Sequence, residues 1–436
     1  MKTHDKEILR LALPALGALA AEPLYVLGDT AVVGHLGTDP LGGLALASTV
    51  LLLIHSIFIF LAYGTTASVA RALGAGNENE AAHQAVQSMW LAAAIGSILA
   101  VCGGFLAPTL VAGLGGEGEI AVNALIYLRI SLLGIPALLV VLAGTGYLRG
   151  LQDTKTTLLI AVISALTNLA LELLLIQGLG FGIAASAWST VVVQYGSLGV
   201  YLWRMGPPIK EHDVRLMPDG AAIRGVARIG GSLLVRTIAL RASLTLATAV
   251  AARTNSSNLA AHHVTFEIWS LLALGLDAVA IAAQALIGRF LGARDAEGAR
   301  AIGHRMLRWG LLSGCALGLG ILALHRLIPH IFTSDPTVVR SATTLLLVVA
   351  ALQPVNGLVF VLDGLLIGAG DTRYLAKAMV VSAAAFTSAA LVVVLTGPDV
   401  VHLWFAIGVL MVVRLTTLWF RWQGDDWVVM GSAKSG

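Results

Sequence analysis

Long apolar segments separated by short polar ones run through almost the whole chain. Each is long enough to cross a bilayer as a helix, which takes about 20 residues. The segments are 8–36, 41–72, 80–106, 119–148, 154–176, 181–203, 220–252, 258–291, 296–324, 337–367, 372–395 and 400–421. We therefore predict an all-α polytopic membrane protein with twelve transmembrane helices. Several segments exceed about 25 residues, so their helices must tilt, kink or protrude.

The composition agrees with this prediction. Hydrophobic residues make up 57% of the chain and charged residues 12%, against about 25% charged in a soluble domain. The net charge of +3 is too small to indicate nucleic acid as a partner. The two cysteines, Cys102 and Cys315, form no CxxC pair, so we expect neither a disulfide framework nor a metal site.

The first apolar segment has two interpretations. Lys2, Lys6 and Arg10 precede it, and Ala18-Leu19-Ala20 resembles the cleavage site of a secretory signal peptide. Cleavage there would leave an odd number of helices and disturb the charge asymmetry of the chain. We therefore interpret the segment as the first transmembrane helix.

Basic residues predict the orientation. Most of the 27 Lys and Arg residues lie at segment ends that are cytoplasmic if the N-terminus is inside. Three lie at the opposite ends and three inside apolar segments, namely Arg253, Arg326 and Arg340, then Arg129, Arg236 and Arg241. The positive-inside rule thus predicts that both termini are cytoplasmic. We expect a multi-pass protein of the bacterial cytoplasmic (inner) membrane.

The two halves of the chain share motifs in one register. Three features recur after 218 residues (71 to 289, 136 to 354 and 150 to 368). They are Arg71-x-x-Gly74-Ala75 with Arg289-x-x-Gly292-Ala293, Pro136 with Pro354, and Gly150-x-x-Asp153-Thr154 with Gly368-x-x-Asp371-Thr372. Three matches at one separation indicate an internal duplication, in which Pro136 and Pro354 should kink helices four and ten at matched depth.

The duplication predicts the domain organisation. We expect an N-terminal six-helix lobe at 1–203, a cytoplasmic linker at 204–219, a C-terminal six-helix lobe at 220–424 and a cytoplasmic tail at 425–436. Because six is even, both lobes enter the membrane from the same side. They should be related by a pseudo-two-fold axis along the membrane normal, as in transporters with parallel repeats.

Three stretches carry a family resemblance. They are DTAVVGHLG at 29–37, LDAVAIAAQALIGRFLGA at 276–293 and GTGYLRGLQDT at 144–154. With twelve helices in two repeats, the chain resembles the multidrug and toxic compound extrusion (MATE) family, and in particular its DinF-like branch. The resemblance implies secondary active antiport, in which a proton or sodium gradient drives export of amphipathic, often cationic, small molecules. It implies no enzyme activity and no cofactor besides the coupling ion.

Acidic residues inside the membrane are candidates for the coupling site, because burying an ionisable group in the bilayer costs free energy and such residues usually have a function. Asp29 lies about 10 Å from the outer end of helix one. Asn168 and Glu172 share one face of helix five near the same depth. The resemblance implies that these three residues form the proton or cation site. Pro14 and Pro23 give helix one weak points at which it can bend.

The other ionisable groups allow two interpretations each. Glu22 faces the same way as Asp29, so it is either a second relay acid or a cap for the backbone freed by Pro23. His263 and Glu267 are four residues apart and could line the cavity, but no third ligand supports a metal site. A second set of intramembrane groups forms either structural ion pairs or part of the transport pathway: Arg236, Arg241, Asp277 and Asp363.

Several alternatives stay open at this stage. A sodium-coupled antiporter differs only in its ion. A lipid-linked precursor flippase of the same superfamily would need a cationic cavity, for which Arg129, Arg236 and Arg241 are the candidates. A membrane-embedded enzyme would need a cluster such as HExxH or a Ser/Lys dyad near an interface, and the sequence has neither. ATP-driven transport is unsupported because no Walker lysine pattern is present. We expect a monomer in the lipid bilayer, and the sequence does not name the cargo.

Overall fold

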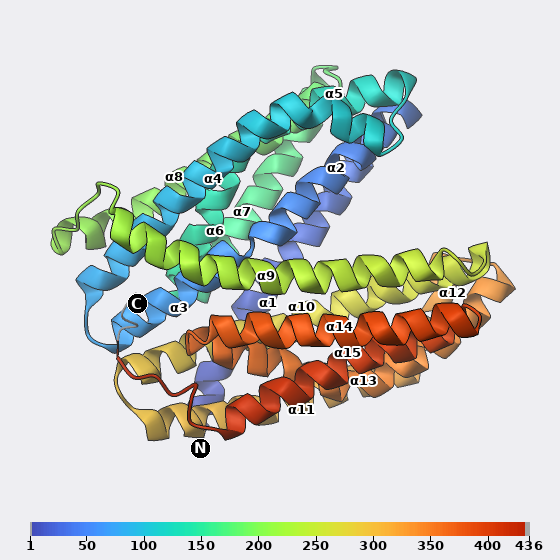
Figure 1. Cartoon of the computed structure of the whole chain (residues 1–436). Coiled ribbons are helices and arrows are strands. Elements are labelled where there is room, and N and C mark those ends of the chain that lie inside the picture. Colours follow the sequence, from blue (N-terminus) through green and yellow to red (C-terminus); the bar gives the residue numbers. More distant parts are fainter. Residues whose placement is uncertain (1, 432–436) are drawn as a thin grey trace. The chain divides into compact units, whose positions relative to one another are not determined.

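The computed structural model describes residues 2–431, and helices account for its regular structure (Figure 1). The helices are α1 Lys2–Gly34, α2 Thr38–Phe58, α3 Phe60–Gly74, α4 Glu78–Gly113, α5 Gly118–Leu132, α6 Ile135–Gly150, α7 Thr154–Glu172, a π-helical turn Leu173–Gly178, α8 Ile183–Glu211, α9 Gly220–Ala251, α10 Ser256–Gly292, α11 Ala296–Leu324, α12 Pro329–Phe332, α13 Pro336–Gly368, α14 Thr372–Thr396 and α15 Val400–Gln423.

These helices confirm the predicted fold class. Within residues 2–431, ten helical spans are long and apolar enough to cross a membrane, and the bent pair α5–α6 makes an eleventh. The remaining long helix, α8, has 29 residues, and its last two turns contain Arg204 and Lys210. Together they match the twelve predicted segments in order, so the protein is an all-α polytopic membrane protein.

The chain forms two compact units. The N-terminal unit holds Leu13–Gly230, and the C-terminal unit holds Gly231–Gly431 together with the residues up to Ala12. In the C-terminal unit, α13, α14 and α15 lie side by side (Figure 1). The first turns of α1 belong to this unit because the carboxylate of Asp5 accepts hydrogen bonds from Arg305 Nε at 2.6 Å and Trp309 Nε1 at 2.9 Å. The domain boundaries expected from the sequence stay a prediction.

The duplication reappears as the same helix contact in both units. A Cβ atom built on Gly146 would lie 2.4 Å from the carbonyl oxygen of Ala62, and one on Gly364 would lie 2.3 Å from that of Ala280. Gly364 follows Gly146 by the predicted 218 residues, and Ala280 follows Ala62 by the same number (146 to 364 and 62 to 280). Small residues let helix backbones approach closely in membrane proteins, so each unit uses glycine at the same crossing.

Filling this crossing should destabilise the protein. A side chain at Gly364 must separate α13 from the backbone of Ala280, and such overpacking costs about 1–3 kcal/mol. We expect Gly364→Val to lower the midpoint of thermal unfolding in detergent by about 3–10 °C. The matched control is Gly320→Val on α11, where a Cβ would meet no atom within 4 Å. Equal midpoints for the two variants would contradict the close crossing.

The two repeated prolines behave differently. The helix is interrupted between α5 and α6, where the helix axis bends by 50°. Pro136 is the second residue of α6. Pro354 lies inside α13, which continues as one helix through it, so the second copy has no break at the repeated proline. The preceding residues give the reason: Gly134 weakens the helix in the first copy, whereas Leu352 favours it in the second.

The segment that joins α8 to α9 is tied to α4. The helix α8 covers the first half of the predicted linker 204–219. The indole Nε1 of Trp90 donates a hydrogen bond to the carbonyl oxygen of Leu216 at 2.8 Å. Further along, the backbone N–H of Asp219 donates to Gln87 Oε1 at 2.9 Å. These bonds hold the linker against the N-terminal unit.

Asp219 ends this linker and caps the first turn of α9. Its Oδ1 accepts the backbone N–H of Ala221 at 2.8 Å and that of Ala222 at 3.3 Å. These bonds, first that from Ala221, stabilise the carboxylate and lower the pKa of Asp219. A lowered pKa means that the cap contributes at neutral pH and is lost in acid, as the pH falls through that lowered value.

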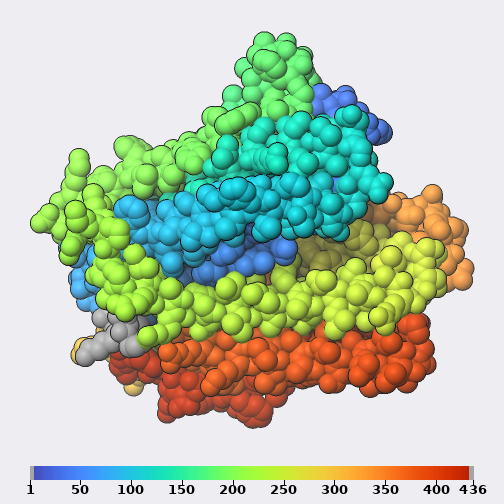
Figure 2. Space-filling view, turned by 45° about the horizontal axis from the view of Figure 1, so that its top comes forward, coloured from blue at the N-terminus to red at the C-terminus, as the bar shows by residue number. Residues whose placement is uncertain are grey.

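The outer face of α4 is apolar, as expected for contact with lipid. Ile98, Val101, Phe105 and Leu106 are all exposed on it. In Figure 2, α4 crosses the visible face as a light-blue to cyan band that no other segment covers. Exposed apolar residues along a spanning helix are typical of a lipid-facing surface.

Candidate coupling site and cavity

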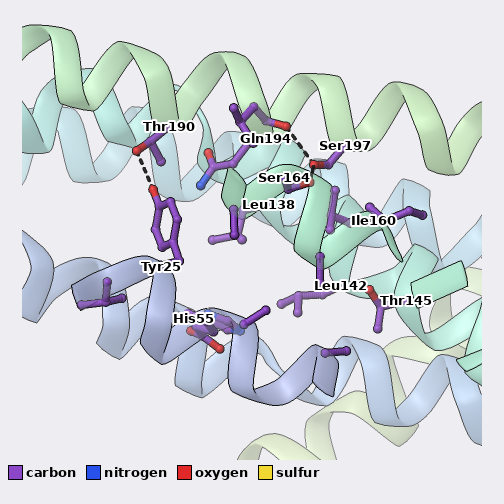
Figure 3. Close-up of a pocket in the computed structure, with 18 of the residues that line it drawn as sticks. Tyr25, His55, Leu138, Leu142, Thr145, Ile160, Ser164, Thr190, Gln194 and Ser197 are labelled. Atoms are coloured by element: carbon purple, nitrogen blue, oxygen red, sulfur yellow. Dashed lines mark hydrogen bonds and ion pairs between the residues drawn. The ribbon is translucent and has the colours of Figure 1, made fainter. Parts of the chain in front are cut away.

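A cavity of about 320 Å³ lies inside the N-terminal unit, with walls from α1, α2, α5, α6, α7 and α8 (Figure 3). This volume is at the lower end of the range for small-molecule sites, about 300–1,000 Å³. Its walls are mainly aliphatic and aromatic. Pairs of hydroxyl groups interrupt them, such as Tyr25 with Thr190 at 2.6 Å and Ser164 with Ser197 at 2.7 Å. Apolar walls with a few polar groups are typical of sites for amphipathic ligands.

Asp29 lies on the wall of this cavity and is held by two hydroxyl groups. It is buried on α1, with 6% of its surface exposed. The phenol of Tyr127 on α5 donates to Oδ2 at 3.0 Å, and the hydroxyl of Ser186 on α8 lies 2.5 Å from Oδ1. The carboxyl group is therefore fixed by residues from two other helices.

The helix-five pair predicted from the sequence meets Asp29 here. Asn168 and Glu172 are both buried in the last turns of α7, and a π-helical turn follows Glu172. All three residues line a second, smaller cavity of the N-terminal unit. Ser186 connects the acids, since its Oγ also lies 2.8 Å from Glu172 Oε1.

The position of Ser186 limits the charge of the pair. A hydroxyl group has one hydrogen to donate and otherwise accepts. It can donate to Asp29 or to Glu172 but not to both, so the second short contact is a hydrogen bond only if that carboxyl group carries a proton. Two carboxyl groups in one buried network also repel each other when both are ionised. The geometry thus fits one shared proton.

Two buried oxygens at the site have no donor. Among residues 2–431, neither Glu172 Oε2 nor Asn168 Oδ1 has a hydrogen-bond partner. Buried acceptors are rarely left without a partner in folded proteins. These two oxygens are acceptors that a cation with a preference for oxygen ligands could use.

The hydroxyl groups of the site were missed in the sequence. Ser186 and Tyr127 lie in apolar segments, where single Ser and Tyr residues give no signal of their own. One signal could have found Ser186. The helices α7 and α8 form a hairpin around Leu179, and residues at equal distance on either side, such as Glu172 and Ser186, lie across from each other.

Glu22 also lines the large cavity, with a partner that the sequence did not indicate. Its Oε1 lies 2.6 Å from Nδ1 of His55 on α2, and its side chain is 44% exposed. Both roles predicted for Glu22 stay open, and its contact with His55 adds a titratable partner at the cavity wall. Pro14 and Pro23 both lie within the continuous helix α1.

In the C-terminal unit, Asp363 on α13 lies between two arginines. Arg236 NH2 on α9 binds its Oδ2 at 2.6 Å, and Arg414 on α15 binds the same oxygen. The sequence had offered Asp277 or Asp363 with Arg236 or Arg241, and the structure has the Arg236–Asp363 pair. Arg414 was not predicted, because it lies two turns from the end of its apolar segment, where basic residues commonly flank the membrane.

The remaining predicted residues lie elsewhere on α5, α9 and α10 than the walls of the two cavities. Asp277 is half-buried on α10, and Arg241 is exposed on α9. His263 and Glu267 are exposed on α10, one turn apart, and Arg129 is exposed on α5. None of these five lines either cavity of the N-terminal unit described above.

Known proteins support the resemblance found in the sequence. A protein DETOXIFICATION 44, chloroplastic, from Arabidopsis thaliana is 34% identical over 86% of this chain and 74% of its own length. The DNA damage-inducible protein F of Escherichia coli K12 is 27% identical over 98% and 95%. A structure described as an outward-facing multidrug resistance MATE family transporter superposes with a TM-score of 0.87 at 20% identity, covering 96% of both chains.

The family model agrees with the internal duplication. The model MatE matches twice, at residues 14–174 and 233–393, once in each half. The two matched ranges cover more than half of the chain and include Asp29, Asn168 and Glu172. The chain therefore belongs to the MatE family of multidrug and toxic compound extrusion proteins.

Proposed function

We propose that the protein is a proton-coupled antiporter that exports amphipathic, often cationic, compounds by alternating access. Asp29 and Glu172 carry the proton, with Asn168 and Ser186 as its hydrogen-bonding partners. The cavity of the N-terminal unit takes the cargo. The names of related proteins, which include multidrug resistance transporters, support a drug-like cargo.

One observation carries this proposal. Ser186 lies within hydrogen-bond distance of both carboxyl groups, so the network is complete only when one of them is protonated. Loss of that proton replaces a hydrogen bond by a contact between two acceptors. The network must then rearrange, and a buried, strongly coupled network rearranges between discrete states.

Asp29 links the proton to the cargo. It lines the large cavity and the smaller one that Asn168 and Glu172 share. A cationic cargo beside Asp29 favours its ionised form, and a proton on the pair disfavours the cargo. Competition of this kind couples the two fluxes, since each ligand lowers the affinity for the other.

Sodium is the second candidate ion. The unpartnered oxygens of Asn168 and Glu172 are hard ligands of the kind that cations prefer. Localisation in a bacterial cytoplasmic membrane, cytoplasmic termini and a monomeric state are part of the same proposal.

An ion-swap experiment tests the proposal. The purified protein is reconstituted into vesicles, and the vesicles are loaded with the fluorescent cation rhodamine 123. Either a proton gradient or a sodium gradient is then imposed across the vesicle membrane. We expect a proton gradient without sodium to drive dye transport, and collapse of that gradient by an uncoupler to stop it. Transport driven by a sodium gradient alone would show that sodium, and not the proton, is the coupling ion. Transport that neither gradient changes would overturn the proposal of antiport.

A further inference from the structure

Arg149 is a buried cation on the wall of the large cavity. It is the penultimate residue of α6, and 6% of its surface is exposed. Its Nε has no hydrogen-bond partner among residues 2–431. The nearest acid along the chain, Asp153, pairs with Arg204 at 3.4 Å. A charge taken out of water in this way is costly unless something pairs with it.

The fold itself does not require this arginine. The second copy of the same helix end has Ile367 at the equivalent position (149 to 367), and Ile367 is buried as well. Both copies form the same turn, from Gly150 to the α7 cap in the first and from Gly368 to α14 in the second. An apolar residue satisfies this position in one unit, so the charge in the other has another use.

The neighbours of Arg149 place it at one end of the cavity. Thr145 lies one turn earlier on α6, and its hydroxyl bonds to Tyr201 at 2.8 Å. Tyr201 is within electrostatic reach of Arg149. Figure 3 shows Thr145 on the side of the pocket away from Tyr25, which is one turn from Asp29 on α1. The cavity therefore has acids toward one end and a guanidinium toward the other.

We propose that Arg149 binds the carboxylate of a zwitterionic amphipathic cargo whose positive group faces Asp29 and Glu22. This inference rests on the proposed export function and adds a substrate class to it. A guanidinium can form two parallel hydrogen bonds with a carboxylate, and Arg149 lines the cavity that would hold the cargo. The carboxylate of the bound cargo would supply a counter-charge to this guanidinium.

Two dyes that differ at one group test the proposal. Rhodamine 110 carries a free carboxylate, and rhodamine 123 is its methyl ester. Dissociation constants are measured by fluorescence anisotropy with the full-length protein in dodecyl maltoside, without any gradient. We expect wild type to bind rhodamine 110 more tightly by about tenfold to a hundredfold, the effect of a charged hydrogen bond.

Three variants test whether Arg149 causes the preference for rhodamine 110. Arg149→Ile, the residue of the second repeat, should bring the ratio of the two constants to about one, and Arg149→Lys should keep part of the ratio. Arg300→Gln removes an arginine of the exposed Arg300–Asp425 pair in the other unit and should leave the ratio as in wild type. A wild type that does not prefer rhodamine 110, or an Arg149→Ile protein that keeps the preference, overturns the proposal.

A lipid phosphate is the competing occupant. Phosphatidylglycerol added to the binding assay would displace rhodamine 110 from wild type if a lipid phosphate occupies Arg149, and that result would overturn the cargo assignment. Two different experiments distinguish a failure of this inference from a failure of the proposed export function. The ratio of constants needs no gradient, and the ion-swap experiment uses the ester, which lacks the carboxylate.

Discussion

Replacing Asp29 with asparagine is expected to reduce gradient-driven dye efflux to the background of empty vesicles. Asparagine keeps the size of the side chain and can still bond to Tyr127 and Ser186, but it neither takes up nor releases a proton. The variant should therefore insert and fold. The measurement is rhodamine 123 transport in vesicles under an imposed proton gradient, with protein content matched to wild type.

Two comparisons make this result specific. Asp39→Asn changes an exposed acid near the start of α2 in the same way and should transport like wild type. Binding of rhodamine 123 to Asp29→Asn, measured without a gradient, shows that the cavity is intact. Efflux by Asp29→Asn that still responds to the gradient would remove Asp29 from the coupling site.

The sequence was sufficient for the features that depend on spacing and hydropathy. Twelve apolar segments gave the spans, and the depth of Asp29 in one segment matched that of Asn168 and Glu172 in another. The meeting of these three residues followed from alternating helix direction and 1.5 Å per residue. The cost of leaving a charge alone in the membrane predicted that Asp277 or Asp363 pairs with Arg236 or Arg241, and the structure was needed to identify the Arg236–Asp363 pair.

The missing parts depend on side-chain direction and packing. Ser186 and Tyr127 are ordinary residues of membrane helices, and only the hairpin geometry of α7 and α8 brings Ser186 between two acids. Arg149 looks like a flanking residue of a helix end, but the packing of α6 turns it toward the cavity. The helix is broken next to Pro136 but not at Pro354, and we attribute this difference to the neighbouring residues Gly134 and Leu352.

The duplicated scaffold carries different chemistry in its two copies. At the 218-residue offset, Asn168 and Glu172 correspond to Phe386 and Ala390, which are buried and apolar (168 to 386 and 172 to 390). In the other direction, Asp363 corresponds to Thr145, which lines the cavity (363 to 145). The glycine crossings are shared, whereas these intramembrane acids are not. The acids proposed for coupling therefore belong to the N-terminal unit, while the C-terminal unit has a buried ion cluster with another role.

That role is expected to be structural, and Asp363→Asn tests it. The substitution leaves the guanidinium groups of Arg236 and Arg414 buried without the carboxylate that both contact. Removing one partner of a buried pair costs about 3–5 kcal/mol. We expect the midpoint of thermal unfolding in detergent to fall by about 10 °C or more. Asp425→Asn, which removes the exposed partner of Arg300, should change the midpoint by no more than about 2 °C.

A transport measurement separates the structural role from a coupling role. At a temperature well below its own midpoint, folded Asp363→Asn should still export rhodamine 123 under a proton gradient, because the proposed proton site is in the other unit. The apolar variant Asp363→Leu with Arg236→Met and Arg414→Met should recover part of the lost stability, since replacing a whole buried ion cluster by packed apolar residues is often neutral. A folded Asp363→Asn protein without transport would instead place Asp363 in the coupling pathway, and an unchanged unfolding midpoint would show that the cluster does not stabilise the unit.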